Sequence, residues 1–308
     1  MKKDNLKNII PIKQRIRLFL ERFNTNLASK FIKTNKKTDK VYTVSNIPYT
    51  KDKQNPILQF DWHCPLNLAC NRFYTKCPTL FYIHGGAWSA GDKSIFSILA
   101  KDFAENGLIV ININYSLMPE KDFSATFNDV YNCIKFCLDN QNYLGIDNQK
   151  IFLGGDSAGA HLASLFCAKQ TSKQLSLDCN ILGAILFYGV YNLNNLENLK
   201  LNICKTLHTT FKTTKQDLQK FYTDFSTTTY LTPNFPPTFI TAGKVDNLCQ
   251  ESEDLIQKLN SLNVPVTSLI FPKNRLDARH AFVNLHLKAR QEALSFANTF
   301  IKEQLKNT

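Results

Sequence analysis

From Lys40 onward, short apolar runs rich in β-branched and aromatic residues alternate with longer stretches of helical periodicity. This alternation predicts an α/β fold in which helices flank both faces of a mostly parallel sheet of eight strands. Two of the runs, LIVININY and ILGAILFYG, are almost wholly apolar, which is typical of interior parallel strands. Right-handed crossovers bring the carboxyl ends of such strands to one edge of the sheet, where the sites of α/β proteins form.

The expected strands are residues 41–49, 56–63, 79–84, 107–115, 150–154, 180–190, 238–243 and 265–271. The expected helices lie at about 93–106, 127–142, 158–170, 252–262 and 282–305. Residues 192–232 interrupt the alternation and are too long for a simple crossover, so they predict a lid or insertion of one or two polar helices. The chain has 308 residues, 44% of them hydrophobic, which suffices for one domain with an insertion or for two domains.

Positive charge is concentrated in the first part of the chain. Residues 1–40 hold twelve Lys or Arg and three Asp or Glu, so of the net charge of +12 only about +3 belongs to the rest. Apolar residues recur at helical spacing from Pro11 to about Thr34 and predict a basic amphipathic helix. This helix either packs on the body or lies on an anionic membrane surface. Because the excess charge is confined to this arm, nucleic-acid binding is not indicated.

The nine cysteines have irregular spacings and include no C-x-x-C pair. Reduced thiols in a cytoplasmic protein are the simplest interpretation. Cys64, Cys70 and Cys77 form the nearest approach to a cluster, but their spacing fits no usual zinc site, and we expect neither a metal nor a cofactor. No apolar stretch of signal-peptide length follows the basic N-terminus, and the longest apolar run, Ile181–Tyr191, is too short to span a bilayer.

The stretch IFLGGDSAGAH, residues 151–161, places Ser157 between Gly155 and Gly159, after a strand and before a helix. G-x-S-x-G in this setting indicates a nucleophilic serine held on a sharp strand-to-helix turn. The glycines would allow strand and helix to approach closely, and the Ala158 N–H would lie at the helix start, where an anion is favoured. The alternative is a serine that belongs only to a tight structural turn.

The stretch FYIHGGAW, residues 81–88, ends an earlier strand with two adjacent glycines. The N–H groups of Gly85 and Gly86 are candidate donors to the oxyanion of a tetrahedral intermediate, a role worth ~3–4 kcal/mol per donor. We expect His84 to form hydrogen bonds within this loop. Trp88 is expected in the wall of the substrate pocket or in the core.

Asp246 follows a late strand, and His280 lies between the last strand and the last helix. The order Ser157, Asp246, His280 is that of the α/β-hydrolase triad, in which the carboxylate orients the imidazole that accepts the serine proton. His161 and Asp277 are the rival base and acid. Asp277 lies three residues before His280 in a polar loop, whereas Asp246 ends a strand in the expected place.

These motifs resemble those of the hormone-sensitive-lipase-like family of α/β-hydrolases, the bacterial esterases with H-G-G-x and G-D-S-A-G motifs. The matching stretches are HGGAW at 84–88, NYSLMPE at 114–120, FNDV at 127–130, LGIDNQKIFLGGDSAGAHLA at 144–163, GKVDNL at 243–248 and HAF at 280–282. The resemblance covers roughly residues 57–305. Ala87 stands where the family often has a third glycine, and Ser116 where it usually has an arginine. HGGAW with the following GDK also resembles arylformamidases of the same fold.

The resemblance implies a catalytic triad and an oxyanion hole, formed respectively by Ser157, Asp246 and His280 and by the N–H groups of Gly85, Gly86 and Ala158. It also implies a helical cap built from residues 1–40 and the insertion at about 192–232, over a hydrolase domain of residues 41–308. Asp156 is expected to brace the turn, and His161 to pack or form hydrogen bonds.

We therefore expect a serine carboxylic-ester hydrolase that works through an acyl-enzyme on small to medium acyl esters. The alternatives are an arylformamidase-type amidase of the same fold and a non-catalytic protein that binds a small molecule in the same pocket. Acyl chain length and oligomeric state are not encoded in any of these motifs.

Overall fold

The computed structural model describes residues 40–50, 57–69, 76–195 and 215–308. The amphipathic helix expected over 11–34 lies outside these residues, as does the middle of the expected insertion at 192–232. Statements about the fold therefore concern the four described ranges.

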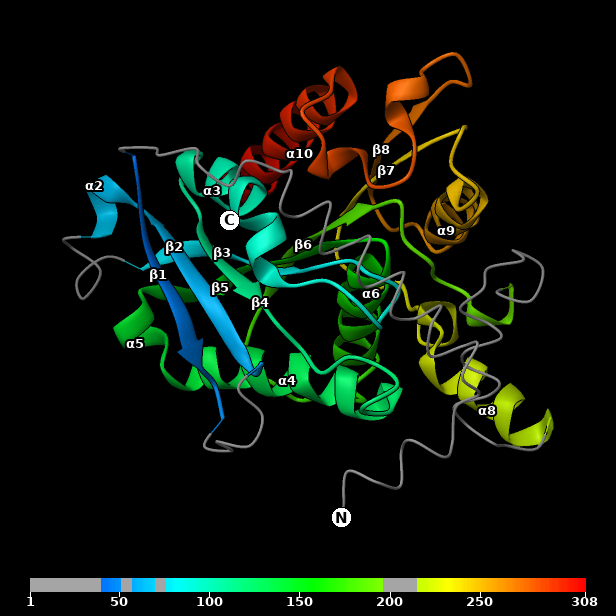
Figure 1. Ribbon diagram of the computed structural model, residues 1–308, viewed down its shortest axis with the longest axis horizontal. Helices are drawn as coiled ribbons and strands as arrows, with labels where there is room; N and C mark the ends of the chain where they lie inside the picture. The colour runs from blue at the N-terminus through cyan, green and yellow to red at the C-terminus, as the bar shows by residue number, and fades with distance from the viewer. Residues whose placement is uncertain (1–39, 51–56, 70–75, 196–214) are drawn as a thin grey trace.

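All eight expected strands are present in one sheet (Figure 1). The strands are β1 (Val41–Pro48), β2 (Gln59–Pro65), β3 (Cys77–Ile83), β4 (Ile109–Ile113), β5 (Ile146–Asp156), β6 (Ile181–Phe187), β7 (Thr238–Gly243) and β8 (Val266–Phe271). Their order is β1-β2-β4-β3-β5-β6-β7-β8, with β2 antiparallel to both of its neighbours and the remaining pairs parallel. Strand β4, apolar except for Asn112, is buried along its whole length, as expected of an interior strand.

Helices cover both faces of this sheet. The α-helices are α2 (Leu66–Ala69), α3 (Ser97–Glu105), α4 (Phe123–Asp139), α5 (Gln141–Leu144), α6 (Ala158–Thr171), α8 (Lys215–Phe225), α9 (Cys249–Ser261) and α10 (Lys288–Lys306). The 3-10 helices are η2 (Lys93–Phe96), η3 (Leu193–Asn195), η4 (Thr227–Thr229), η5 (Leu276–Ala278) and η6 (Phe282–Asn284). Helices α3 and α10 pack on one face, and α4, α6 and α9 pack on the other (Figure 1).

Several helices begin at residues other than those expected, and at α4 and α10 side-chain contacts explain the difference. Helix α4 starts four residues early at Phe123, since the Asp122 carboxylate accepts a hydrogen bond from the Ala125 N–H at 2.7 Å. Helix α10 starts six residues late at Lys288, and the Ala289 N–H in its first turn donates to Asp277 at 2.8 Å. The residues before it form η6 and an extended link instead.

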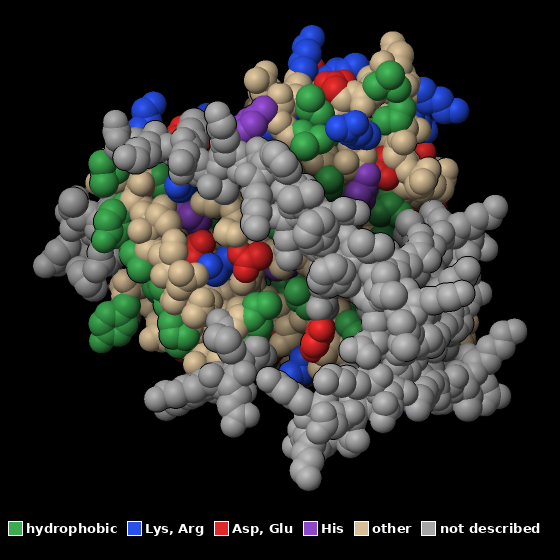
Figure 2. Space-filling view, viewed as in Figure 1, with side chains coloured by type: hydrophobic (Ala, Val, Ile, Leu, Met, Phe, Trp, Pro, Cys, Tyr) green, Lys and Arg blue, Asp and Glu red, His purple; other side chains and the backbone are tan. Residues whose placement is uncertain are grey.

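The surface of the described residues carries both signs of charge. In Figure 2, Lys and Arg side chains lie among Asp and Glu side chains on the face that is shown. This distribution agrees with the small net charge of the chain after Lys40. In the described residues, no helix is both long enough and apolar enough to cross a membrane.

Candidate active site

The candidate nucleophile lies on a strained turn between β5 and α6. Ser157 has φ 52° and ψ −118°, a backbone conformation that a residue with a side chain rarely adopts. Its N–H donates to Phe187 O at 2.9 Å, which fixes the turn to the end of β6. A Cβ on Gly155 would lie 2.5 Å from the carbonyl carbon of Gly159, and a Cβ on Gly159 would lie 2.0 Å from Ile83 O. Both glycines are therefore required by close backbone approach.

Ser157, His280 and Asp246 form a continuous hydrogen-bonded chain. The Ser157 hydroxyl lies 3.0 Å from His280 Nε2, and His280 Nδ1 lies 2.7 Å from Asp246 Oδ2. A carboxylate can only accept at this position, so the Nδ1–H donates to Asp246 and Nε2 is left to accept from the serine. The Asp246 side chain is 3% exposed, whereas that of His280 is 41% exposed. The imidazole thus links a buried carboxylate to an accessible hydroxyl.

Backbone contacts place the acid and the base. The Asp246 N–H donates to Gly243 O at 2.8 Å, and Asp246 Oδ1 accepts from the Leu248 N–H at 2.9 Å, so the carboxylate is fixed in the turn after β7. A Cβ on Gly243 would lie 2.0 Å from Ala278 O. The end of β7 therefore touches the turn of residues 276–287, which we call the histidine turn because it carries His280.

The amide groups predicted for the oxyanion hole are not equivalent. The Gly85 N–H donates to Asp156 Oδ1 at 2.9 Å, so this donor is occupied and the expectation for Gly85 needs correction. Within the described residues, the N–H groups of Gly86 and Ala158 have no acceptor. Ala158 begins α6, where unpaired backbone donors favour an anion. Gly86 and Ala158 are thus the two predicted donors that are available.

Trp88 lies in the core, which is the second of the two positions expected for it. The residue is 2% exposed, and its indole packs edge-on against Phe123 at 5.8 Å and against His161 at 5.4 Å between ring centroids. Its positive φ of 57° lies in the tight loop after Gly86, so the backbone turns here before the ring enters the core.

Two other histidines have structural surroundings. His84 stacks on Tyr115 at 4.3 Å, and its Nδ1 lies 2.7 Å from Gly85 O. The His161 Nε2–H donates to Phe225 O at 2.7 Å, which joins α6 to the end of α8. Burial lowers the pKa of each imidazole to about 4, so both are neutral at physiological pH. Neither is part of the chain of hydrogen bonds at Ser157.

Asp277, the rival acid, is occupied elsewhere. Its two carboxylate oxygens accept from the Arg275 guanidinium at 2.8 and 3.0 Å, and Oδ2 also accepts from the Ala289 N–H. The hydrogen bonds from Arg275 lower the pKa of Asp277 to about 2. Asp277 thus holds the start of α10, and Asp246 is the carboxylate that faces His280.

Two residues at the site escaped the sequence analysis. Tyr188 packs edge-on against the His280 imidazole, with 5.0 Å between ring centroids, and has φ 39°. Its one signal was its position directly after β6, at the carboxyl edge of the sheet. Asn284, in the histidine turn, lies close enough to Asp156 to act to lower the pKa of its carboxyl. No sequence pattern connects these two residues, since the contact depends on how the turn after β8 folds back.

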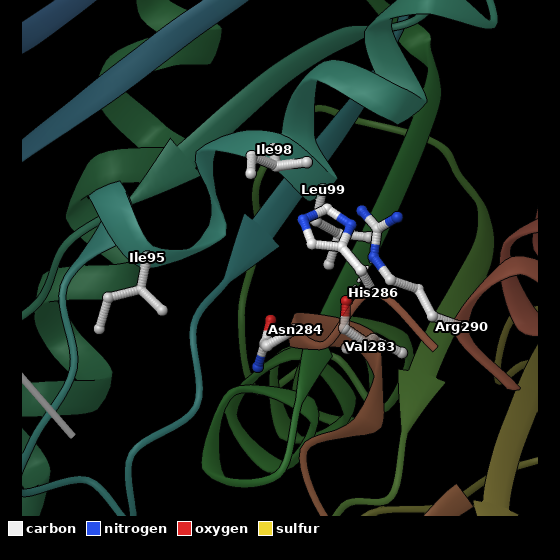
Figure 3. Close-up of a pocket in the computed structure, with 7 residues that line it drawn as sticks. All are labelled: Ile95, Ile98, Leu99, Val283, Asn284, His286 and Arg290. Atoms are coloured by element: carbon white, nitrogen blue, oxygen red, sulfur yellow. Dashed lines mark hydrogen bonds between the residues drawn. The ribbon is translucent and has the colours of Figure 1, made fainter. Parts of the chain in front are cut away.

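A small pocket lies behind the histidine turn (Figure 3). Its lining comes from η2 and α3 on one side and from the histidine turn and α10 on the other, and consists of Ile95, Ile98, Leu99, Val283, Asn284, His286 and Arg290. Arg290 Nε donates to Val283 O at 2.7 Å, and its guanidinium pairs with Asp102 of α3 at 2.5 Å. Arg290 therefore fixes the histidine turn to both helices.

Polar groups also anchor the two ends of the insertion. Glu251 of α9 accepts hydrogen bonds from the N–H groups of Tyr191 and Asn192, each at 2.9 Å, and from the Asn195 side chain at 2.7 Å. At the other end, the Lys169 ammonium of α6 lies 4.4 Å from the centre of the Tyr230 ring. Among the described residues, no group of three His, Cys, Asp or Glu side chains is arranged to hold a metal ion.

The sheet order and the placement of Ser157, Asp246 and His280 after three of its strands define the α/β-hydrolase fold. The chain belongs to the BD-FAE family, whose profile matches residues 68–259, more than half of its length.

Curated relatives are esterases and a deacetylase. The chain is 30% identical over 217 residues to esterase LipQ of Mycobacterium tuberculosis, a match that covers 68% of this chain and 50% of LipQ. It is 43% identical over 90 residues to arylacetamide deacetylase of Bos taurus, covering 28% of this chain and 23% of that protein. The matched regions thus span half or less of these relatives.

Solved structures share the fold over nearly the whole chain. Esterase B of Lactobacillus rhamnosis superposes with a TM-score of 0.81 at 19% identity, covering 95% of this chain and 96% of that one. An esterase of Pyrobaculum calidifontis gives a TM-score of 0.74 at 22% identity, covering 94% of each chain.

Proposed function

We propose that the protein is a serine carboxylic-ester hydrolase. The observation that carries the proposal is the hydrogen-bonded chain from Ser157 through His280 to Asp246, at 3.0 and 2.7 Å, on a turn that exposes the serine hydroxyl. The relationship to esterase LipQ supports the ester as the bond that is cleaved. The role of each of the three side chains follows from whether it donates or accepts a proton.

In the first half-reaction, Ser157 Oγ bonds to the ester carbonyl carbon while its proton passes to His280 Nε2. The alcohol then leaves with that proton as the carbon–oxygen bond breaks, and the acyl group remains on Ser157. In the second half-reaction, water gives a proton to Nε2 and attacks the acyl carbon. Ser157 Oγ departs and regains the proton. Asp246 stays ionised and stabilises the imidazolium in both halves.

The negative oxygen of each tetrahedral intermediate needs donors that are not already bonded. Gly86 and Ala158 supply their N–H groups, because the N–H of Gly85 is taken by Asp156. Each such donor is worth ~3–4 kcal/mol to the transition state. Ala158 adds the partial positive charge of the N-terminus of α6.

The insertion serves as part of a cap over the site, and the substrates are small to medium acyl esters. This part of the proposal is supported by the position of α8, whose final carbonyl, Phe225 O, accepts from His161 one turn after Ser157. Phe225 and Phe221 pack on Phe123 at 4.8 and 5.6 Å between ring centroids. The N-terminal helix that would complete the cap, or contact a membrane surface, lies outside the described residues.

A cytoplasmic location is proposed on the state of the cysteines. Five of those in the described residues, Cys133, Cys137, Cys167, Cys179 and Cys249, carry free thiols. Free buried thiols are typical of proteins from reducing compartments.

The test is kcat/KM across p-nitrophenyl esters of increasing acyl length, with aryl formamides measured alongside. Esters should be preferred, with the best rates at short to medium acyl chains. Ser157→Ala should lower kcat by at least about a thousandfold and abolish labelling by a fluorophosphonate probe. Ser164→Ala is the matched control, because Ser164 is another serine of α6 and its hydroxyl bonds that of Thr227. This variant should be labelled like the wild type.

Each alternative predicts a different result. Faster turnover of aryl formamides than of any ester would favour the amidase. A wild-type protein that the probe does not label, and that turns over neither substrate class, would favour a non-catalytic binding protein. Labelling that persists in Ser157→Ala would contradict the assignment of Ser157 as the nucleophile.

A further inference from the structure

Asp156 precedes the candidate nucleophile, and its carboxylate bonds Tyr82 and Gly85 instead of joining the hydrogen-bonded chain of Ser157, His280 and Asp246. The residue is 2% exposed, and its carboxylate contacts three different segments. Oδ1 accepts from the Gly85 N–H at 2.9 Å and from the Tyr82 hydroxyl at 3.1 Å. The side chain of Asn284, in the histidine turn, is near enough to the carboxylate to act to lower its pKa. One buried group thus joins the strand β3, the glycine loop after it and the histidine turn.

Resting on the proposed hydrolase function, we propose that Asp156 is a positioning residue that holds the oxyanion loop and the histidine turn against the nucleophile. Gly85 immediately precedes Gly86, so a bond to the Gly85 N–H limits the rotation of the peptide units that aim the Gly86 N–H. Asn284 lies four residues after His280, so an attraction between Asp156 and Asn284 restrains the turn that aims the imidazole. Because Ser157 directly follows Asp156 in the chain, these contacts fix the position of both segments relative to the nucleophile.

The contact between Asp156 and Gly85 is close enough to exclude other residues. A Cβ on Gly85 would lie 2.5 Å from Asp156 Oδ2 and 2.8 Å from Asp156 O. The loop therefore lies directly on the carboxylate with no side chain between them. The loop therefore cannot move independently of Asp156, because closely packed interiors are hard to deform.

The carboxylate also carries charge at neutral pH. Burial raises the pKa of Asp156 to about 6, while the hydrogen bonds from Gly85 and Tyr82 and the attraction to His280 act to lower it. The charge in turn raises the pKa of Tyr82, Tyr115 and Tyr188, although burial is the larger cause for each.

Two substitutions separate the hydrogen bonds from the charge. Asp156→Asn retains an oxygen for Gly85 and Tyr82, and its amide can donate to Asn284 Oδ1, which has no partner within the described residues. This variant removes the charge and can keep the bonds after Asn284 turns its amide over. Asp156→Ala removes the charge and the bonds together. Asn284→Ala and Tyr82→Phe each remove one partner and leave the carboxylate in place.

The experiment measures kcat and KM on a p-nitrophenyl ester and the rate of fluorophosphonate labelling of Ser157, with the fold checked by thermal unfolding. Asp156→Ala should lower kcat by about a hundredfold, as expected for misaimed groups, and leave KM within about threefold. Asp156→Asn should recover about tenfold of this loss. Asn284→Ala and Tyr82→Phe should each cost several-fold in kcat. Asp129→Asn, a control that removes another carboxylate bonded to a backbone N–H, should leave kcat unchanged.

The outcomes separate this inference from the function on which it rests. A folded Asp156→Ala variant that keeps wild-type kcat and labelling overturns the positioning role alone. So does an Asp156→Asn variant that loses as much as Asp156→Ala, since the retained bonds would then contribute nothing. Where Asp156→Ala does not fold, unchanged kcat in both Asn284→Ala and Tyr82→Phe overturns it. A wild-type protein that is neither labelled nor active overturns the proposed function, and this inference with it.

Discussion

At the scale of single residues, two aspartates compete for the role of the acid, and their surroundings separate them. Asp246 faces His280 Nδ1 at 2.7 Å, whereas Asp277 is bonded to Arg275 and to the start of α10. Asp246→Asn keeps the shape of the side chain, but its amide can donate to His280 Nδ1 as well as accept from it. The imidazole can then carry its proton on Nε2, where it cannot accept the proton of Ser157. We expect kcat to fall by about a thousandfold or more, with little change in the thermal midpoint.

Asp277→Asn is the matched control for this prediction. It should leave kcat within about threefold and slightly lower the stability, because it weakens the capping of α10. Since the pKa of Asp277 is lowered to about 2, its contribution exists above the ordinary value of 3.8 and is lost as the pH falls below it. A larger loss of kcat in Asp277→Asn than in Asp246→Asn would reverse the two assignments.

At the residue scale, the sequence is most informative where a position accepts only one residue type. G-D-S-A-G and H-G-G located the serine and the glycine loop, because few other residues tolerate such close backbone contacts. They could not show that Gly85 gives its N–H to Asp156, because that bond depends on how the loop turns after β3. The sequence left two positions open for Trp88 for a related reason, since a bulky aromatic residue beside a site can face either the pocket or the core.

At the scale of elements, the anchors of the insertion carry a prediction about stability. Glu251 is 3% exposed and accepts three hydrogen bonds from residues 191–195. Glu251→Ala leaves these donors without an acceptor, so we expect the free energy of unfolding to fall by about 3 kcal/mol. Glu251→Gln keeps an oxygen for the two backbone N–H groups, and Asn195 can turn its amide toward the new donor. It should cost less than about 1 kcal/mol.

Chemical denaturation of the two variants measures the difference. Equal losses for Glu251→Ala and Glu251→Gln would mean that the charge, and not the set of acceptors, stabilises this end of the insertion.

The strands of the sheet were easier to predict from sequence than the first residues of the helices. The eight strands were predicted because apolar runs have one stable place, inside a sheet. The starts of α4 and α10 were not, because Asp122 and Asp277 cap them through contacts that periodicity does not record.

At the scale of the whole molecule, the buried charge of Asp156 predicts how stability depends on pH. Its pKa is raised to about 6 from the ordinary value of 3.8, so the folded chain binds this proton more tightly than the unfolded chain. Stability therefore falls as the pH rises from about 3.8 to about 6, and above that range the ionised carboxylate carries a constant cost. Asp156→Asn should be more stable than the wild type at pH 8, by up to about 3 kcal/mol.

Thermal unfolding at pH 4, 6 and 8 tests this expectation. The advantage of Asp156→Asn should shrink toward pH 4, where the wild-type carboxyl is protonated. An advantage that is the same at all three values would show that packing, and not ionisation, is responsible. Greater stability with lower kcat in one variant would be the trade-off expected when a site keeps a costly charged group for function.

The contact between Gly243 and Ala278 O bears on how far the sequence can diverge. Because main chain meets main chain here, the spacing of Asp246 and His280 does not depend on which apolar side chains fill the core. Residues of the two core faces can then be replaced over evolutionary time at constant volume, while the few glycines at backbone contacts cannot. Two esterases of known structure share this fold with the chain at 19 and 22% identity. Divergence of this extent is what we expect when the core can vary and the glycines at backbone contacts cannot.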